Sequence, residues 1–414
     1  MNRFRPTTRI AGVTAGVLLA PCTLAQVDDL SAARAYEAEL LADASSRTSL
    51  LAAAAGGGWE KGKFFIGDGE ANTMNIGGTL QTRYLVNIRD EAAGDPEDFT
   101  SGFQVRRTRL RVSGTVWDKN LSYSLQGDFS RSSGTFTLLD AEGRYKFDNG
   151  MFVRWGQYKV PLLREELVGD HYQLAVERST VNAVFTQERS QGVGLGYARG
   201  QFRVAGDLSD GLATVNTDFD SAKEADIAGT IRADWFWGTE DVKRFDDFTS
   251  FRGSGYAGLA GAAIHYQSSG ETGGGAADVD IIQATADISI EGNGWNAFVA
   301  GVWRNMETPA ADADDFGFIA QAGVFASDQV EFFGRFDAVV PDDTGGADSF
   351  NTITAGVNYY VSPTSHAFQL SADVLYYLDA QASAGIVPAS TGSNLLADTE
   401  EGQVALRIQA QIIF

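Results

Sequence analysis

Polar and apolar residues alternate along most of this chain, and the alternation is clearest in the stretch FQVRRTRLRVSGTV at 103–116. Successive side chains of a strand point to opposite faces, so Arg107, Arg109 and Arg111 share one face and mostly apolar side chains occupy the other. Three stacked guanidinium groups are poor core residues, but they suit the wall of a water-filled passage. The stretch therefore predicts a strand with water on one side and an apolar environment on the other.

The same period of two residues recurs up to the C-terminus and predicts an all-β fold of about sixteen strands. Short turns alternate with long acidic connections, which is typical of a transmembrane antiparallel β-barrel. The connection at 238–253 is long where a short turn is expected, so it is either an enlarged turn or a missed hairpin. The predicted strands lie near 80–89, 103–116, 121–130, 139–147, 151–159, 190–198, 201–208, 226–237, 255–267, 278–290, 294–304, 314–325, 329–339, 350–361, 366–377 and 402–414.

The N-terminal segment follows a different pattern. Residues 1–25 combine three arginines, an apolar stretch and a small-residue cleavage site, which predicts a secretory signal peptide. Residues 26–55 contain no glycine or proline and predict a helix, which a glycine linker ends at residue 58. This periplasmic segment, 26–58, is either an arm for trimer assembly or cell-wall contact, or a solvated amphipathic leader. The barrel is expected to occupy 59–414.

Composition narrows the class of protein. The 414 residues include 47 glycines and only 8 prolines, and 11% are aromatic, which fits many antiparallel strands. Beyond the N-terminal segment no run approaches the roughly 20 apolar residues of a membrane helix, so a helical membrane protein is excluded. The net charge of −22 argues against nucleic acid as a partner. The single cysteine, Cys22, falls in the predicted signal peptide, so no disulfide framework is expected.

Aromatic residues, such as Trp117, Trp235 and Tyr359, gather at the predicted strand ends beside the short turns. A membrane barrel places its interfacial girdle in this way, so outer-membrane lipid and lipopolysaccharide are expected around the barrel. The last strand ends in Phe414 and resembles the segment that the outer-membrane assembly machinery recognises. The acidic loops either chelate divalent cations that bridge lipopolysaccharide or keep the surface solvated.

The sequence contains no catalytic signature. Nucleophile elbows, P-loops and H-E-x-x-H patterns are absent, so the chain is not expected to be an enzyme. His171, His265 and His366 lie on separate segments without ligand spacing, so neither a metal site nor a cofactor is expected.

Several segments together resemble the phosphate-selective porin O and P family, a group of trimeric sixteen-stranded outer-membrane channels. The resemblance covers most of the chain after residue 58. The segments that carry it are FQVRRTRLRVSGTV at 103–116, LLDAEGRYKF at 138–147, VRWGQYKVPLLREEL at 153–167, VERS at 176–179, ERSQGVGLGY at 188–197, VEFFGRFD at 330–337 and ITAGVNYYVSP at 353–363.

The resemblance implies a homotrimer, small anions as transported solutes, a column of lumenal arginines and a third long loop, here 160–189, folded inward as the constriction. The candidate pore-lining and anion-binding residues are Arg107, Arg109, Arg111, Arg83, Arg144 and Arg154. The candidate constriction-loop residues are Lys159, Arg164, Glu165, Glu166, Arg178 and Arg189. One departure from the family is that the outer loops are dominated by Asp and Glu, whereas selective members add lysines at the mouth.

Two interpretations of the arginine column stay open. The arginines are transient anion sites, since guanidinium groups pair well with phosphate or carboxylate. Alternatively they pair with Asp140, Glu142, Glu165 and Glu166 and hold the inward loop in place. The predicted function is an outer-membrane diffusion channel for small hydrophilic solutes and ions. A more specific form of this prediction is a channel that prefers anions such as phosphate. The alternatives are a non-selective or cation-leaning porin, a structural barrel anchored to the cell wall by the N-terminal helix, and a lipid-modifying barrel hydrolase.

Overall fold

A computed structural model describes residues 56–60, 63–68, 71–89, 99–271, 278–309, 311–342, 348–383 and 385–414. The predicted signal peptide at 1–25 and the predicted helix at 26–55 lie outside the described residues. The barrel lies within one compact unit, Gly57–Phe414. Within the described ranges, no helix has the length and apolarity needed to cross a membrane.

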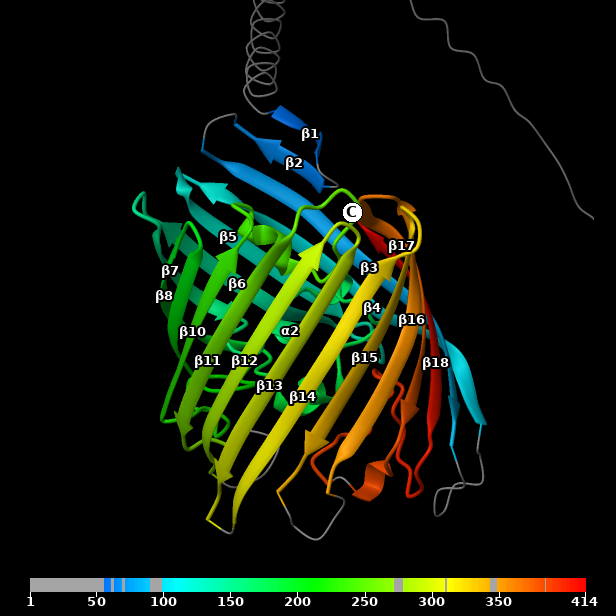
Figure 1. Cartoon of the computed structure of the whole chain (residues 1–414). Coiled ribbons are helices and arrows are strands. Elements are labelled where there is room, and N and C mark those ends of the chain that lie inside the picture. Colours follow the sequence, from blue (N-terminus) through cyan, green and yellow to red (C-terminus); the bar gives the residue numbers. More distant parts are fainter. Residues whose placement is uncertain are drawn as a thin grey trace, which may run out of the picture. The chain divides into compact units, whose positions relative to one another are not determined.

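Sixteen antiparallel strands form a closed barrel, as the alternation predicts (Figure 1). Each strand pairs with the next along the chain, and the ring closes where Ile412 of the last strand lies opposite Leu80 of the first. The strands are β3 (Thr73–Ile88), β4 (Phe99–Val116), β5 (Asp118–Phe129), β6 (Phe136–Lys146), β7 (Met151–Tyr158), β8 (Ser190–Arg199), β9 (Phe202–Ser209), β10 (Ile227–Trp237), β11 (Ala257–Ser268), β12 (Asp280–Gly292), β13 (Trp295–Glu307), β14 (Asp312–Phe325), β15 (Val330–Val340), β16 (Phe350–Ser362), β17 (Ser365–Tyr377) and β18 (Val404–Ile413).

A short hairpin precedes the barrel. It consists of β1 (Gly56–Glu60) and β2 (Lys63–Gly67), and β2 pairs with the early part of β3 through Phe64 and Ile76. The C-terminal residue Phe414 lies next to this pairing, because its backbone N–H donates to Gly78 O over 3.1 Å and its carbonyl accepts from Gly78 N over 2.7 Å. β3 is therefore paired along its whole length, first with β2 and then with β18.

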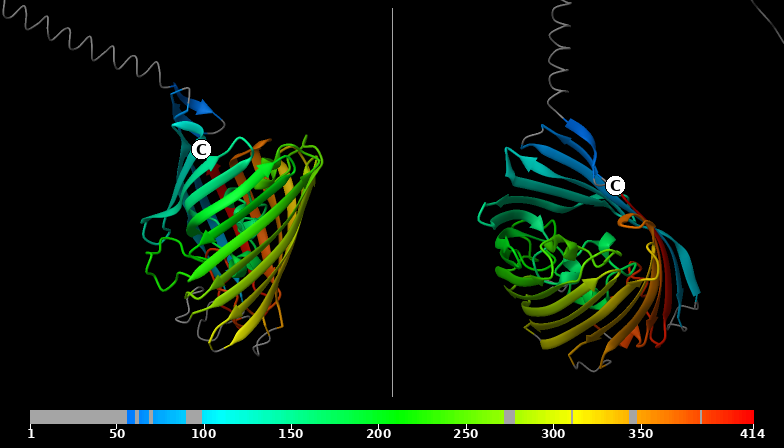
Figure 2. Two further views of the ribbon diagram at one scale, coloured as in Figure 1. Left: turned by 90° about the vertical axis from the view of Figure 1, so that its left-hand side faces the viewer. Right: turned by 45° about the horizontal axis from the view of Figure 1, so that its top comes forward.

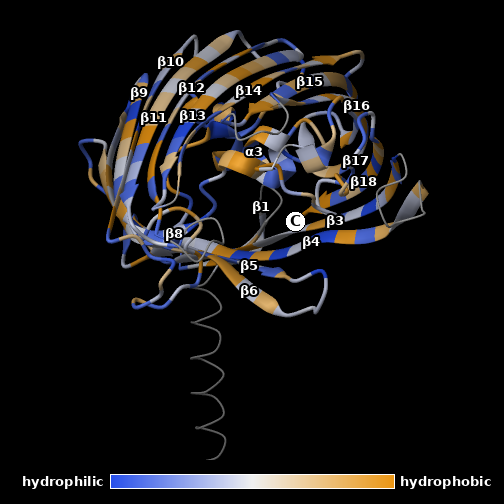
Figure 3. Cartoon of the chain, turned by 90° about the horizontal axis from the view of Figure 1, so that it is seen from below, coloured by the Kyte–Doolittle hydropathy of each residue, from blue (hydrophilic) through white to orange (hydrophobic). Residues whose placement is uncertain are grey.

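The two faces of the barrel wall differ as a membrane requires (Figure 3). Outward side chains are mostly apolar and exposed: Ile231, Ile264 and Ile288 keep 52%, 48% and 45% of their surface accessible. Inward neighbours on the same strands, such as Arg232 and Asp287, are polar and buried. An apolar band outside and polar groups inside are the pattern of an outer-membrane barrel.

Turns at one end of the barrel are short, and most connections at the other end are longer. Only Trp117 separates β4 from β5, and residues 293–294 separate β12 from β13. At the opposite end, residues 159–189, 210–226 and 378–403 are the longest connections, and the last of these contains η3 (Gln381–Ser383). The connection between β10 and β11 is an enlarged turn rather than a missed hairpin, and it contains η2 (Val242–Asp246).

The barrel encloses a segment that is not part of its wall. Residues 159–189, here called the inward loop, contain α2 (Arg164–Leu167), η1 (Asp170–Tyr172) and α3 (Thr180–Phe185), which begins after Ser179 because the Ser179 hydroxyl accepts from Asn182 N over 2.9 Å. Figure 2 shows the tilted strands around these helical turns, and Figure 3 shows α3 inside the ring of strands. Apolar side chains of the inward loop pack against apolar inward residues of β13–β18 in one cluster that includes Leu174, Phe185, Phe298 and Phe350.

Candidate permeation pathway

The inward loop contacts opposite parts of the barrel wall. On one side, Arg83 of β3 donates from Nη2 to Val176 O over 2.7 Å. On the other, Gln283 of β12 donates from Nε2 to Phe185 O over 2.8 Å. β3 and β12 lie nearly opposite each other in the ring of sixteen strands, so the loop crosses the lumen. A loop held at both ends of its span by buried hydrogen bonds is a fixed partition rather than a mobile flap.

Three arginines converge on the loop carboxylate of Glu177. Arg83 Nη1 lies 2.6 Å from Glu177 Oε1, and Arg107 Nη2 lies 2.8 Å from Oε2. Arg106 contributes a third ion pair, at 2.5 Å. Burial alone would raise the pKa of Glu177, but the guanidinium groups of Arg106, Arg107 and Arg83 outweigh it and hold the pKa well below its usual range. The carboxylate is therefore ionised and neutralises part of the arginine column.

A second loop carboxylate, Asp170, binds the next arginines along the column. Arg107 Nη2 lies 3.2 Å from Asp170 Oδ1, and Arg109 and Arg178 each form a further ion pair with the same carboxylate. Burial would raise the pKa of Asp170, and the charges of Arg107, Arg109 and Arg178 hold it well below the usual value. Arg109 also pairs with Asp128 of β5 over 3.0 Å. Arg107 thus binds the inward loop, and Arg109 binds both the inward loop and the neighbouring strand β5.

Other cations predicted for the loop and its surroundings are also paired. Lys159 Nζ lies 2.6 Å from Glu166 Oε1, and burial lowers the pKa of Lys159 to about 8. Arg178 Nε lies 3.3 Å from Glu166 Oε2. Glu165 accepts from Ser179 N and Oγ over 2.8 and 2.5 Å. These contacts fold the loop onto itself and neutralise Lys159, Glu166 and Arg178 within it.

The remaining candidates lie apart from this cluster. Arg154 of β7 forms a two-point contact with Asp207 of β9, over 2.9 and 2.7 Å. Arg189 lies 2.9 Å from Asp140 of β6. Arg164 is buried and has no carboxylate within ion-pair distance in the described part of the chain; its donors reach Ser289 Oγ and the Phe245 carbonyl instead.

Inward residues of β4–β6 are the ones that stay open to water. Arg111 is exposed, and the side chain of Arg144 keeps 40% of its surface accessible beside its partner Glu142. The side chains of Asp128 and Asp140 keep 20% and 21% of their surface accessible. Inward residues of the opposite wall are buried instead, among them Gln283, Thr285, Asp287, Ile319, Gln321, Phe333, Arg335, Asp337, Thr352, Thr354, Asp373, Ala405 and Arg407. The open part of the lumen therefore runs along β4–β6.

Sequence reasoning did not single out the carboxylates that bind the arginine column, nor Arg106. Arg106 is the extra residue of a β-bulge: Gln81 lies opposite Arg107, and Thr82 lies opposite Val105. The Arg106–Arg107 doublet, which interrupts the alternation, was the available signal. For Asp170 and Glu177 the sequence offers none, because their partners are set by where the loop folds.

Comparisons with known proteins support this architecture. The sequence profile of the family described as phosphate-selective porin O and P matches residues 79–233. Among curated proteins, no sequence matches the chain. Several solved structures, in contrast, match the chain in fold. The anion-selective porin from Comamonas acidovorans superposes with a TM-score of 0.57 at 15% identity, over 83% of this chain and 100% of that chain.

Two further structures have the same fold. The outer membrane channel DcaP of Acinetobacter baumannii has a TM-score of 0.56 at 13% identity, over 83% of this chain and 98% of that one. OmpT of Vibrio cholerae, an outer membrane protein solved in a trimer form, has a TM-score of 0.53 at 12% identity, over 83% and 100%. Residues 79–233 of the chain are thus similar in sequence to the phosphate-selective porin O and P family, and the barrel has the fold of outer-membrane β-barrel channels.

Proposed function

We propose that the protein is a passive diffusion channel for small hydrophilic solutes and ions, with its passage between the inward loop and β4–β6. The observation that carries this proposal is the asymmetry of the lumen. Inward side chains of β4–β6 such as Arg111, Gln126 and Arg144 remain partly accessible, while most of those of β12–β18 are buried. The inward loop is then the constriction, and solutes pass along one wall of the barrel only.

The charges along this route favour a weak anion preference. Arg109 pairs with Asp128 and Arg144 pairs with Glu142, so these pairs cancel. Arg111 has no carboxylate within ion-pair distance in the described part of the chain, and its Nε donates only to Ser124 Oγ over 3.3 Å. A fixed positive charge in a narrow passage enriches anions locally, and salt weakens the effect.

Tight phosphate binding is not part of the proposal. The arginines that form the deeper column are engaged by Glu177 and Asp170, so a solute anion meets few free donors. Phosphate is expected to pass as one small anion among others. This is the point at which the chain departs from what its family resemblance implies.

We also infer that three copies assemble, because OmpT of Vibrio cholerae, which has the same fold, was solved in a trimer form. Crosslinking of the detergent-purified protein tests this inference. A ladder that ends at three copies supports it, and a monomer under the same conditions contradicts it.

Reversal potentials in a salt gradient across a planar bilayer test the selectivity. The wild type is expected to show a reversal potential of anion sign, and Arg111→Gln is expected to lose most of it. Arg199→Gln is the matched control, because Arg199 is exposed at the short-turn end of β8 and faces away from the lumen. A cation-leaning wild type, or an effect of equal size in both variants, would contradict the proposal.

A further inference from the structure

The enlarged turn between β10 and β11, residues 239–256 and here called the inward turn, does not extend into solvent. Phe245 and Phe248 keep only 1% and 4% of their surface accessible, although both lie in a connection. Phe245 packs on Phe236 of β10 with ring centroids 5.7 Å apart, and Phe248 packs on Phe298 of β13 at 4.9 Å. The turn therefore folds back into the barrel from the short-turn end.

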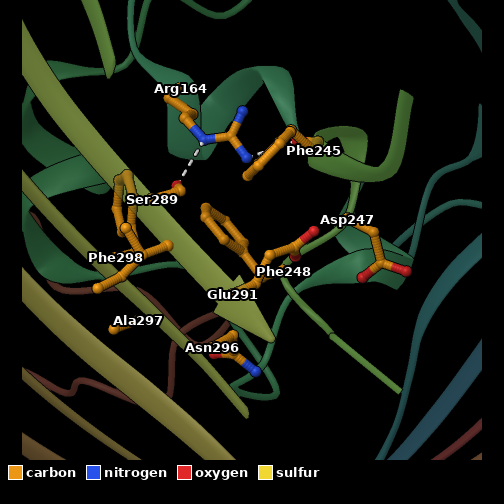
Figure 4. Close-up of a pocket in the computed structure, with 10 residues that line it drawn as sticks. Arg164, Phe245, Asp247, Phe248, Ser289, Glu291, Asn296, Ala297 and Phe298 are labelled. Atoms are coloured by element: carbon orange, nitrogen blue, oxygen red, sulfur yellow. Dashed lines mark hydrogen bonds between the residues drawn. The ribbon is translucent and has the colours of Figure 1, made fainter. Parts of the chain in front are cut away.

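The inward turn contacts the inward loop directly (Figure 4). Arg164 of α2 donates from Nη2 to the Phe245 carbonyl over 2.5 Å, and its guanidinium group lies 5.7 and 5.4 Å from the ring centres of Phe245 and Phe248. Phe248 N donates to Tyr172 O over 3.1 Å. A buried arginine that lacks a carboxylate partner is costly unless other groups solvate it, and here a carbonyl of the inward turn does so.

The inward turn also reaches strands far from its own. Asp247 Oδ2 lies 2.8 Å from His366 Nε2 on β17, and Thr249 Oγ1 lies 3.1 Å from the Tyr360 hydroxyl on β16. Ser250 Oγ donates to the carbonyl of Gly292 on β12 over 2.6 Å. Because its ends are fixed to β10 and β11, the segment spans the short-turn mouth from that side to β17.

Aromatic packing stiffens this attachment. The Phe251 ring lies 5.6 Å from Phe325, 5.1 Å from Tyr360 and 5.3 Å from His366, and Tyr172 of the inward loop lies 5.1 Å from His366. Such ring pairs add to the stabilisation from buried area alone. The inward turn, the inward loop and the β14–β17 wall therefore meet in one packed cluster.

We propose that the inward turn is a second constriction element, which fixes the inward loop from the short-turn end and closes that mouth over β12–β17. The inference rests on the proposed diffusion function. Solutes that pass the inward loop along β4–β6 leave by the same side, because the inward turn covers the other. Phe245, Phe248 and Asp247 are the positioning residues, and the two phenylalanines are buried.

A shortened turn tests the inference. Trp237 lies opposite Gly258, so residues 239–256 can be replaced by an asparagine-glycine turn without changing the strand register. The shortened barrel is expected to show a roughly twofold higher single-channel conductance and a larger size limit for neutral solutes, because both follow pore cross-section. Its current should also fluctuate more, since the inward loop has lost an attachment.

Point variants keep the test valid if the shortened barrel does not fold. Phe248→Ala is expected to raise conductance and current noise, while Lys243→Gln, an exposed position in the same segment, leaves both unchanged. Ser250→Cys in the wild-type background is expected to resist a membrane-impermeant thiol reagent, and to react once Phe248→Ala is added.

The outcomes separate the two proposals. A wild-type protein that does not conduct overturns the diffusion function itself. A conducting wild type whose shortened and Phe248→Ala variants have the same conductance, noise and size limit overturns the role of the inward turn alone. Rapid labelling of Ser250→Cys in the otherwise wild-type barrel also overturns it.

Discussion

Glu177→Gln tests how the arginine column is used. The substitution keeps the shape of the side chain and removes the charge that faces Arg83, Arg106 and Arg107. The side chains of Arg83 and Arg107 are 0% and 4% exposed, so in a buried site Arg83 would lose its carboxylate partner and Arg107 would keep only Asp170. Removing one partner from a buried ion pair costs about 3–5 kcal/mol, and the wild-type carboxylate serves three arginines at once.

That cost falls on the docking of the inward loop rather than on the barrel wall, because the wall is held by its own backbone hydrogen bonds. We expect Glu177→Gln to form a folded barrel whose inward loop detaches near 176–178 and becomes cleavable by protease. In a bilayer the reversal potential should shift further toward anions, since one negative charge is lost from a group of cations. Added phosphate should also reduce the chloride current, because the guanidinium groups then have room for a solute oxyanion.

Glu188→Gln is the control for this experiment, because Glu188 belongs to the inward loop but its side chain is 51% exposed. It should leave protease resistance and reversal potential at wild-type values. If Glu177→Gln also leaves both unchanged, the contacts of Glu177 do not hold the loop, and the account of the arginine column is wrong.

Two further predictions concern pH and the barrel wall. The pKa values of Asp170 and Glu177 are depressed in the folded protein, so their ion pairs stabilise the docked loop above the ordinary carboxyl range near pH ~4 and are lost only as pH falls through the depressed values. The protease resistance of the loop near residues 170–178 should therefore stay constant between pH ~7 and ~5, and cleavage at these residues within that window would contradict the assignment. Gly114→Ala should reduce the yield of folded barrel severely, because a Cβ there would lie 1.8 Å from Thr73 O, whereas Gly102→Ala, with nothing within 4 Å, should assemble normally on heat-modifiable electrophoresis.

The barrel was predictable because its signal is local. A strand with water on one side and lipid on the other must alternate polar and apolar residues, so each strand can be recognised from its own residues. The sixteen predicted stretches match the sixteen strands of the barrel. The family resemblance was visible for the same reason, in segments such as 103–116, and the family profile confirms it.

The contacts inside the barrel could not be predicted in the same way. The partners of Arg107 are Glu177 and Asp170, which lie far along the chain and meet it only after the loop has folded into the lumen. The sequence suggested Glu165 and Glu166 as acidic loop partners, but these carboxylates face Ser179 and Lys159 instead. The unusual length of 238–253 was visible, whereas its inward direction depends on packing against segments such as α2 and β17.

The location of the passage is the central claim, and cysteine accessibility tests it most directly. The described part of the chain contains no cysteine, so a single cysteine introduced into a Cys22→Ser background is a unique probe. Gln126 of β5 lies opposite Arg111 on the lumenal face and is half-buried, while Thr354 of β16 also faces inward but is 1% exposed. We predict that a bulky charged thiol reagent lowers the conductance of Gln126→Cys and leaves Thr354→Cys unchanged. Loss of conductance at Thr354→Cys, or none at Gln126→Cys, would contradict a passage along β4–β6.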